Sequence, residues 1–285
     1  FIPTSSGWVS VAPHPIAKKV ADEISVEGYE NIFFSAVGGS LAPMMAIGEI
    51  AKQITKKPIF IEQAAELLTR GHKSLSNNSI LITLSKSGDT KETVAMAKYA
   101  KENGTRVISL TKELNSPLAL NSNYVIPMRH ENGVEYEYML LFWLFFRLME
   151  NNGDFSEYEK FAEQLKKLPE NLLEAKYKFE PIAKEIGKKY YKEPYMIWIG
   201  SGETWGETYL FSMCLLEEMQ WIKTKSVTSS EFFHGTLELI EKDTCVFLIK
   251  SSGKTRILDD RAEKFLKNYT EKLTVIDTQD FKLEG

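Results

Sequence analysis

The chain repeats one strand-and-loop pattern, and this repeat restricts its fold more than any other feature. In the first half, the apolar run at 31–37 leads into Gly38-Gly39-Ser40 and then into a helical pattern. In the second half, the run at 195–199 leads into Gly200-Ser201-Gly202, and a helical pattern again follows. A tandem repeat of this kind predicts two similar domains.

A second pair of loops repeats in the same order. Gly88 and Gly253 lie 165 residues apart in hydroxyl-rich loops, each followed by a helical pattern and then by a strand, at 106–110 and 273–277. Strands that alternate with helices at this spacing predict parallel, doubly wound sheets. We therefore expect an α/β protein of two tandem three-layer αβα domains. The polar cluster at 151–154 predicts the boundary, which gives domains at 1–152 and 153–285.

The run at 79–90 predicts an anion site. Apolar residues 80–84 end in Ser85-Lys86-Ser87-Gly88-Asp89-Thr90, and a helical pattern begins at once. Free N–H groups at a helix N-terminus favour a bound anion, and hydroxyl groups can donate to the same oxygens. The loop is neither a Walker A sequence nor Gly-x-Gly-x-x-Gly, so it suits a phosphate monoester. An ordinary N-capped helix, with Asp89 or Ser87 as the cap, is the alternative.

Two loops of the first half should lie at the same edge of their sheet. Ligands of open α/β sheets bind at the carboxyl ends of the strands, near the switch point. Gly39-Ser40 and 85–90 both follow predicted strands. They are therefore expected to form two walls of one site.

Glu218 is a candidate general base. It lies at the end of an apolar helical pattern, at helical offsets from Leu215, Trp221 and Ile222. A carboxylate among apolar neighbours has a raised pKa and can accept protons near neutral pH. A surface or capping carboxylate is the alternative, since the adjacent Glu217 can equally face solvent.

His234 is a candidate for proton transfer. It lies in Glu231-Phe-Phe-His-Gly235, where an acid and two aromatic residues precede it. This setting can orient an imidazole, although packed histidines beside aromatic residues are common. The other histidines, His14, His72 and His130, have no comparable neighbours and are expected to be structural.

Composition excludes several classes of function. The net charge is −4 and no dense basic block is present, so we expect no nucleic-acid partner. The longest apolar run, 138–146, is too short to span a membrane. The histidines have no metal-ligand spacing, and Cys214 and Cys245 lie in apolar stretches. We therefore expect a cytoplasmic protein without metal or other cofactor.

Together these segments resemble the sugar isomerase (SIS) domain family, in particular its tandem-domain members. Four segments carry the resemblance in the family's order, and Glu218 and His234 lie 16 residues apart as in that family. The runs around Glu218 and His234 and the later 258–262 are similar to those of bacterial fructosamine-6-phosphate deglycases (fructoselysine- and glucoselysine-6-phosphate deglycases). The isomerase half of glucosamine-6-phosphate synthase is a more distant likeness.

The resemblance implies roles for eight residues. The six expected to hold a sugar 6-phosphate are Gly39, Ser40, Ser85, Lys86, Ser87 and Thr90. Glu218 would move a proton between C1 and C2, and His234 would assist ring opening or protonate the leaving amine. The family's histidine loop commonly comes from a neighbouring subunit, which implies a homodimer, or a higher homo-oligomer, with shared active sites.

The sequence departs from the family at three points. Thr236 stands where the relatives have proline, and Lys86 adds a positive charge to the phosphate loop. The relatives also continue with a C-terminal tail that brings basic residues to the site, and this tail is expected to be absent here.

The expected reaction converts a 1-amino-1-deoxyketose 6-phosphate into glucose 6-phosphate and a free amine through an enolamine. Two alternatives stay open. One is an aldose–ketose or aminosugar 6-phosphate isomerase, and the other is a non-catalytic sugar-phosphate sensor. The identity of the amine is not encoded in any pattern of the sequence.

Overall fold

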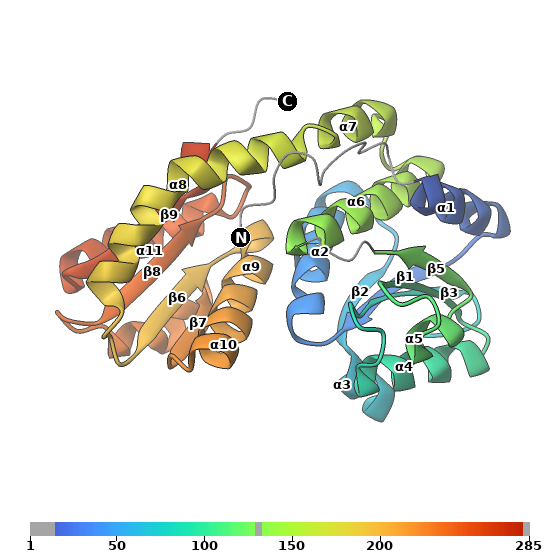
Figure 1. Ribbon diagram of the computed structural model, residues 1–285, viewed down its shortest axis with the longest axis horizontal. Helices are drawn as coiled ribbons and strands as arrows, with labels where there is room; N and C mark the ends of the chain where they lie inside the picture. The colour runs from blue at the N-terminus through green and yellow to red at the C-terminus, as the bar shows by residue number, and fades with distance from the viewer. Residues whose placement is uncertain (1–14, 129–132, 282–285) are drawn as a thin grey trace. The chain divides into compact units, whose positions relative to one another are not determined.

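The computed structural model describes residues 15–128 and 133–281 of the chain. The chain divides between Lys166 and Lys167 into two compact units, here called the N-terminal unit and the C-terminal unit. Each is built around its own parallel sheet with flanking helices (Figure 1). The predicted α/β class, with two parallel sheets flanked by helices, is confirmed. The assignment of domains to 1–152 and 153–285 stays a prediction.

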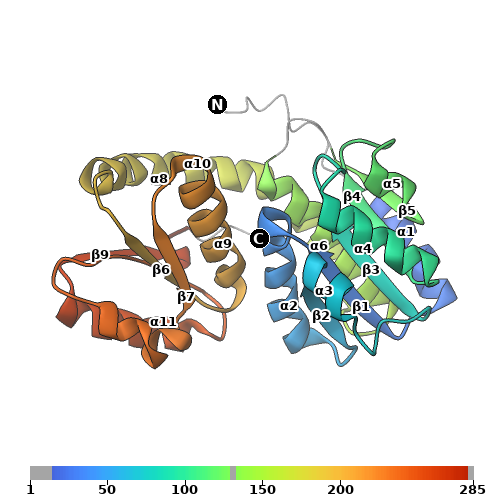
Figure 2. The ribbon, with the colours of Figure 1, turned by 90° about the horizontal axis from the view of Figure 1, so that it is seen from below.

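The N-terminal unit contains a five-stranded parallel sheet in the order β2-β1-β3-β4-β5. Its strands are β1 (Asn31–Ala36), β2 (Ile59–Gln63), β3 (Ser79–Leu84), β4 (Arg106–Thr111) and β5 (Tyr124–Pro127). Its α-helices are α1 (Pro15–Glu27), α2 (Ala42–Ile54), α3 (Ala64–Arg70), α4 (Lys91–Glu102), α5 (Pro117–Leu120), α6 (Val134–Asn151) and α7 (Tyr158–Leu165). Helices α1, α2 and α6 cover one face of the sheet, and α3, α4 and α5 cover the other (Figure 2).

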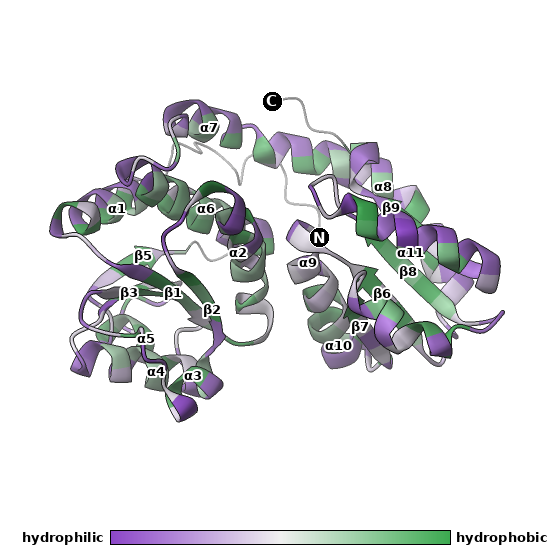
Figure 3. Cartoon of the chain, turned by 180° about the vertical axis from the view of Figure 1, so that it is seen from behind, coloured by the Kyte–Doolittle hydropathy of each residue, from purple (hydrophilic) through white to green (hydrophobic). Residues whose placement is uncertain are grey.

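Both faces of this sheet are buried because helices cover each of them. Neighbouring residues of a strand point to opposite faces, so successive apolar side chains pack against different helices. Phe33 and Leu81 belong to the apolar cluster that includes Met96 of α4. Phe34 faces the other way and meets Phe145 of α6 edge-on, with ring centroids 6.3 Å apart. The central strands therefore read as continuous apolar runs, as in other parallel sheets, and they appear in the hydrophobic colour in Figure 3.

The C-terminal unit repeats the arrangement with four parallel strands in the order β7-β6-β8-β9. They are β6 (Met196–Gly200), β7 (Thr224–Thr228), β8 (Cys245–Lys250) and β9 (Lys272–Asp277). The helices are α8 (Leu168–Tyr190), α9 (Trp205–Tyr209), α10 (Glu218–Gln220) and α11 (Arg256–Tyr269), with a π-helical segment, Leu210–Glu217, between α9 and α10. This strand order matches that of β2-β1-β3-β4, so the predicted internal repeat is present in the fold.

The faces of the second sheet are filled from different elements. Ile197 and Ile199 pack in one cluster with Leu266 of α11. Met196 and Trp198 point to the opposite face and pack in another cluster with Tyr190 of α8. Because alternate residues point to opposite faces, the central strands are again packed against apolar side chains on both faces of the sheet.

Pro169 begins a helix instead of breaking one. A proline within a helical pattern ordinarily ends or kinks the helix, but here the interruption lies before it, between α7 and α8. Pro169 is the second residue of α8, where the missing N–H would have had no partner within the helix. A second proline, Pro181, lies inside the same helix.

Aromatic packing joins α7 to α6 and explains why the compact units divide after Lys166. The ring of Phe146 lies 4.4 Å from that of Phe161 in α7 and 4.8 Å from that of Phe155, measured between centroids. The residues after 152 therefore pack on the N-terminal unit.

Replacement of Phe146 tests this packing. Phe146 is 7% exposed, and Phe146→Ala should lower the free energy of unfolding by about 3–5 kcal/mol because a large buried ring is lost. The control Tyr177→Ala, at a residue 53% exposed, should change it by less than about 0.5 kcal/mol. Urea denaturation followed by circular dichroism measures both, and equal effects would contradict the assigned packing.

Candidate active site

The two predicted phosphate loops follow neighbouring strands. Gly38–Ser40 forms a short 3-10 turn directly after β1, and 85–90 follows β3. Strands β1 and β3 pair in parallel, so both loops lie at the same edge of the sheet. In the order β2-β1-β3-β4-β5, β2 is added on one side of β1, whereas β3, β4 and β5 are added on the other. The order of the parallel strands therefore reverses between β1 and β3. This is the switch point at which open α/β sheets bind ligands.

Hydroxyl groups hold the 85–90 loop in shape. Ser85 is buried, and its Oγ accepts a hydrogen bond from the N–H of Gly88 at 3.1 Å and shares another with Oγ1 of Thr90 at 2.8 Å. The carbonyl of Gly88 accepts from the N–H of Leu118 at 2.9 Å. These bonds fix the loop from inside, while the side chains of Lys86 and Ser87 are exposed.

The alternative of an ordinary capped helix is not what the structure shows. The cap residue of α4 is Thr90, and its side chain makes no capping hydrogen bond. Ser87 instead donates to the carboxylate of Asp89. The first N–H groups of α4 have no carbonyl partner within the helix, so they stay available to an anion.

Glu218 lies outside the apolar face on which it was expected. Glu218 is exposed, and Trp221 is 89% exposed, whereas Ile222 packs against the core. The prediction assumed α-helical spacing, but the preceding Leu210–Glu217 is π-helical. Because π-helical hydrogen bonds join residues five apart, the α-helical offset between Leu215 and Glu218 does not hold. The helix also ends at Gln220, before Trp221 and Ile222.

The structure separates Glu217 from Glu218. The Oγ1 of Thr224, at the start of β7, donates to Oε1 of Glu217 at 2.6 Å and lies 2.6 Å from Oγ of Ser212. Since Thr224 has one hydroxyl proton, Ser212 donates to Thr224 and Thr224 donates to Glu217. Within the described part of the chain, Glu218 makes no such bond. Glu217 is thus held by a hydrogen bond from Thr224, whereas the role of Glu218 stays a prediction.

The helix that carries Glu218 ends in an uncommon conformation. Trp221 adopts a left-handed backbone conformation with φ 58°, and no other non-glycine residue with positive φ occurs among the described residues. Bulky residues rarely adopt it, and such strain gathers at functional sites.

His234 lies on an anchored loop after β7. It ends the 3-10 segment Glu231–His234, whose Phe232 is fully buried. The guanidinium of Arg261 lies 3.9 Å from the ring centroid of Phe233. The imidazole itself is exposed. Neither a hydrogen bond nor an ion pair links it to Glu218 in the described residues, so their pairing stays a prediction.

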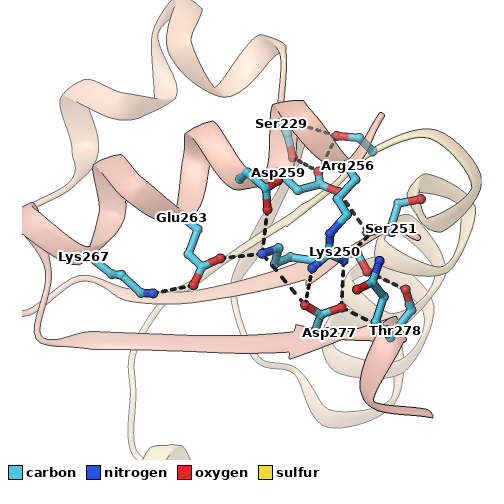
Figure 4. Close-up of polar contacts among 12 residues, drawn as sticks. Ser229, Lys250, Ser251, Arg256, Asp259, Glu263, Lys267, Asp277 and Thr278 are labelled. Atoms are coloured by element: carbon cyan, nitrogen blue, oxygen red, sulfur yellow. Dashed lines mark hydrogen bonds and ion pairs between the residues drawn. The ribbon is translucent and has the colours of Figure 1, made fainter. Parts of the chain in front are cut away.

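Sequence reasoning missed a buried polar network in the C-terminal unit (Figure 4). Asp259 of α11 is fully buried. Its Oδ1 accepts from Ser201 Oγ at 2.8 Å and Ser229 Oγ at 2.5 Å, and its Oδ2 accepts from Ser251 N–H at 2.8 Å. Burial raises the pKa of Asp259 although these hydrogen bonds oppose the shift. The run 258–262 was noted only as a likeness, since no local pattern links Asp259 to serines on three loops.

Charged side chains beside this network are paired internally. Lys250 ends β8 and lies 2.7 Å from Asp260 and 2.6 Å from Glu263. The guanidinium of Arg256 donates to both carboxylate oxygens of Asp277, at 2.8 and 2.5 Å. This hydrogen bond lowers the pKa of Asp277 to about 2.

Other candidate groups are structural where they are described. The ring of His72 packs edge-on against Phe33 with centroids 5.0 Å apart, whereas His14 and His130 lie outside the described residues. Residues 15–128 and 133–281 contain no group of His, Cys, Asp or Glu that could hold a metal ion. Over the same ranges, no helix has the length and apolar character needed to cross a membrane.

Gly88 allows a test of the loop. Its φ is +73°, and a Cβ there would lie 2.2 Å from Oγ of Ser116. Gly88→Ala should therefore deform the loop and weaken binding of glucose 6-phosphate at least about tenfold, the equivalent of 1.4 kcal/mol. Gly153→Ala has a comparable φ of +82° without a neighbour within 4 Å, so it should leave binding unchanged. Calorimetric titration with glucose 6-phosphate measures the dissociation constant of both variants. An unchanged dissociation constant in Gly88→Ala would contradict the proposed role of this loop.

The Arg256–Asp277 pair predicts a pH dependence of stability. Because the pKa of Asp277 is lowered to about 2 in the folded chain, its stabilisation is complete above the ordinary pKa of about 3.9 and is lost as pH falls through about 2. The difference in unfolding free energy between the wild type and Asp277→Asn should stay constant from pH 7 to about 5 and shrink below about 4. Urea titrations across this range measure it. A difference that does not change with pH would show that the carboxylate charge is irrelevant.

Comparison with known proteins places this chain among sugar-phosphate proteins. Residues 27–146 match the SIS domain family. Fructosamine deglycase FrlB of Bacillus subtilis (strain 168) is 31% identical over 259 residues, which cover 88% of this chain and 78% of that protein. Fructoselysine 6-phosphate deglycase of Escherichia coli (strain K12) is 21% identical over 92% of this chain and 77% of its own length. The chain spans only 41% of an isomerizing glutamine–fructose-6-phosphate aminotransferase from Thermococcus kodakarensis, with 26% identity.

Solved structures agree with these relatives. A Bacillus subtilis protein described as a phosphosugar isomerase has a TM-score of 0.91 and 28% identity, over 97% of this chain and 86% of its own. A similarly described protein from Salmonella typhimurium LT2 has a TM-score of 0.88 and 29% identity, over 94% of this chain and 83% of its own. With two parallel sheets of the same strand order and loops at the switch point of the first, the chain belongs to the SIS domain family.

Proposed function

We propose that this chain is a phosphosugar enzyme that cleaves a 1-amino-1-deoxyketose 6-phosphate into glucose 6-phosphate and a free amine. The observation that carries the proposal is the hydroxyl-lined loop 85–90 at the switch point between β1 and β3, where the uncapped end of α4 suits a phosphate. The similarity to two proteins named as deglycases supports this substrate class.

The N-terminal unit would bind the phosphate. The residues assigned to it are Gly39, Ser40, Ser85, Lys86, Ser87 and Thr90. Ser85 and Thr90 shape the loop through the hydrogen bond between their hydroxyls, whereas Lys86 and Ser87 are exposed and can meet the ligand. A phosphate held away from C1 and C2 supplies binding energy that positions the reacting carbons.

Proton transfer is assigned to the C-terminal unit. Glu218 would remove a proton from C1 of the open-chain ketose, giving an enolamine, and return it to C2, giving an aldimine. Addition of water to the aldimine and loss of the amine complete the reaction, with His234 assisting ring opening or protonating the leaving amine. Substrate and water thus yield glucose 6-phosphate and amine without an oxidant or reductant.

The exposure of Glu218 and His234 supports a shared active site. A carboxylate acts as a base near neutral pH when it is withdrawn from water, and Glu218 is exposed in the single chain. We therefore propose that the active form is a homodimer or higher homo-oligomer in which a second copy covers this residue.

Neighbouring glutamates provide the matched test. Glu218→Gln should lower kcat for a fructosamine 6-phosphate by about 10²-fold or more, while the dissociation constant for glucose 6-phosphate stays within about twofold. Glu217→Gln loses the carboxylate charge but keeps an oxygen that can accept the Thr224 hydrogen bond, and it should retain most turnover. Release of glucose 6-phosphate, followed with a coupled dehydrogenase, measures both variants.

The pattern of outcomes separates the alternatives. Near wild-type turnover in Glu218→Gln would remove this residue from the chemistry. Turnover of fructose 6-phosphate or glucosamine 6-phosphate, with no release from N-substituted substrates, would favour an isomerase. Binding of sugar phosphates without turnover of any of them would favour a sensor.

A further inference from the structure

The two units place the same turn after their first strand. Gly38–Ser40 follows β1 and Gly202–Thr204 follows β6, both as 3-10 turns. The leading glycine has a φ of +53° in the first turn and +56° in the second. The sequence repeat aligned Gly38 with Gly200, whereas the structure aligns Gly38 with Gly202, a shift of two residues. This alignment pairs Gly39, which has no side chain, with Glu203.

The loops after β3 and β8 have similar internal hydrogen bonds, although the second loop is one residue shorter and Gly253 lacks the positive φ of Gly88. In the N-terminal unit, Oγ of Ser85 accepts from the N–H of Gly88 at 3.1 Å. In the C-terminal unit, Oγ of Ser251 accepts from the N–H of Gly253 at 2.9 Å. Because β6 and β8 pair in parallel as β1 and β3 do, the C-terminal unit has the framework of the same anion site.

In the C-terminal unit, a carboxylate of the chain itself lies against this loop. Oε2 of Glu203 accepts a hydrogen bond from Oγ of Ser251 at 3.1 Å. A Cβ on Gly253 would lie 2.4 Å from the same oxygen, so the carboxylate touches the loop glycine. A negative group therefore fills the space that faces the loop.

A second carboxylate binds the first N–H of this loop, that of Ser251, whereas the equivalent N–H of Ser85 donates to the carbonyl of Leu110. Helices α4 and α11 both begin directly after a threonine, and their fourth residues are Val94 and Asp259. Val94 packs against the apolar core together with Val37. Asp259 instead accepts from Oγ of Ser201, which stands in the place of Val37, and from the N–H of Ser251.

The nearby cations are also occupied. Arg256, the first residue of α11, is held by Asp277, and Lys250 is held by Asp260 and Glu263 (Figure 4). A phosphate at this loop would compete with three carboxylates for two cations, and would meet the carboxylate of Glu203 directly.

We infer that the second phosphate cradle of this chain is permanently closed by its own carboxylates. Glu203 occupies the place of the ligand and other carboxylates pair with the nearby cations, so each chain takes one phosphate-bearing ligand, at 85–90. The equivalence with a phosphate site rests on the proposed function of the N-terminal loop.

Exchange of the paired residues tests this inference. Equilibrium dialysis with inorganic phosphate should give one site per chain in the wild type. Glu203→Gly and, as a second variant, Glu203→Ser should each gain one weaker site. The mirror variant Gly39→Glu should raise the dissociation constant of the first site at least about tenfold, because like charges repel. Thermal unfolding confirms that each variant is folded.

The outcomes distinguish this inference from the proposed function. A gain of one site in either Glu203 variant supports the inference, even if the wild type binds no phosphate and the proposed function fails. Two sites in the wild type, or no gain in either of the two folded Glu203 variants, would overturn it. Unchanged binding in folded Gly39→Glu, where the wild type binds one phosphate, would overturn the equivalence of the two turns.

Discussion

Parallel strand pairing is the constraint on which the rest of this molecule depends. Strands that run the same way end at the same edge, and their loops gather there whatever their sequences. The order of strands then decides which loops become neighbours. With β1 beside β3 and β6 beside β8, each unit brings the loops after its first and third strands together. The proposed ligand site in one unit and the internal ion pairing in the other are two uses of the same edge.

The parts of the fold that depend on short stretches of sequence could be predicted. Apolar runs that end in glycine and hydroxyl residues indicated the strands and the loops that follow them, because β1 and β3 are buried on both faces. The surroundings of Glu218 could not be predicted in this way. They depend on the π-helical segment Leu210–Glu217, and no residue pattern in that segment predicts a change from α-helical to π-helical hydrogen bonding.

Contacts between distant segments were equally hidden. Asp259 meets serines 30 and 58 residues away, and its sequence neighbours are those of an ordinary amphipathic helix. The repeat between Gly39 and Glu203 was obscured for a similar reason. Each of the two segments, 38–40 and 200–202, contains two glycines, so the sequence can be aligned in more than one way. Only the left-handed conformations of Gly38 and Gly202 decide which positions correspond.

The left-handed residue that ends α10 has a practical consequence. Trp221 lies three residues from Glu218 and is 89% exposed, whereas Trp143 and Trp198 are 1% and 5% exposed. A quencher in solution therefore reaches the indole of Trp221 far more readily than those two. The protein thus carries an intrinsic fluorescent reporter at the segment that holds the proposed base, and a surface that comes to cover Glu218 would shield this indole from water.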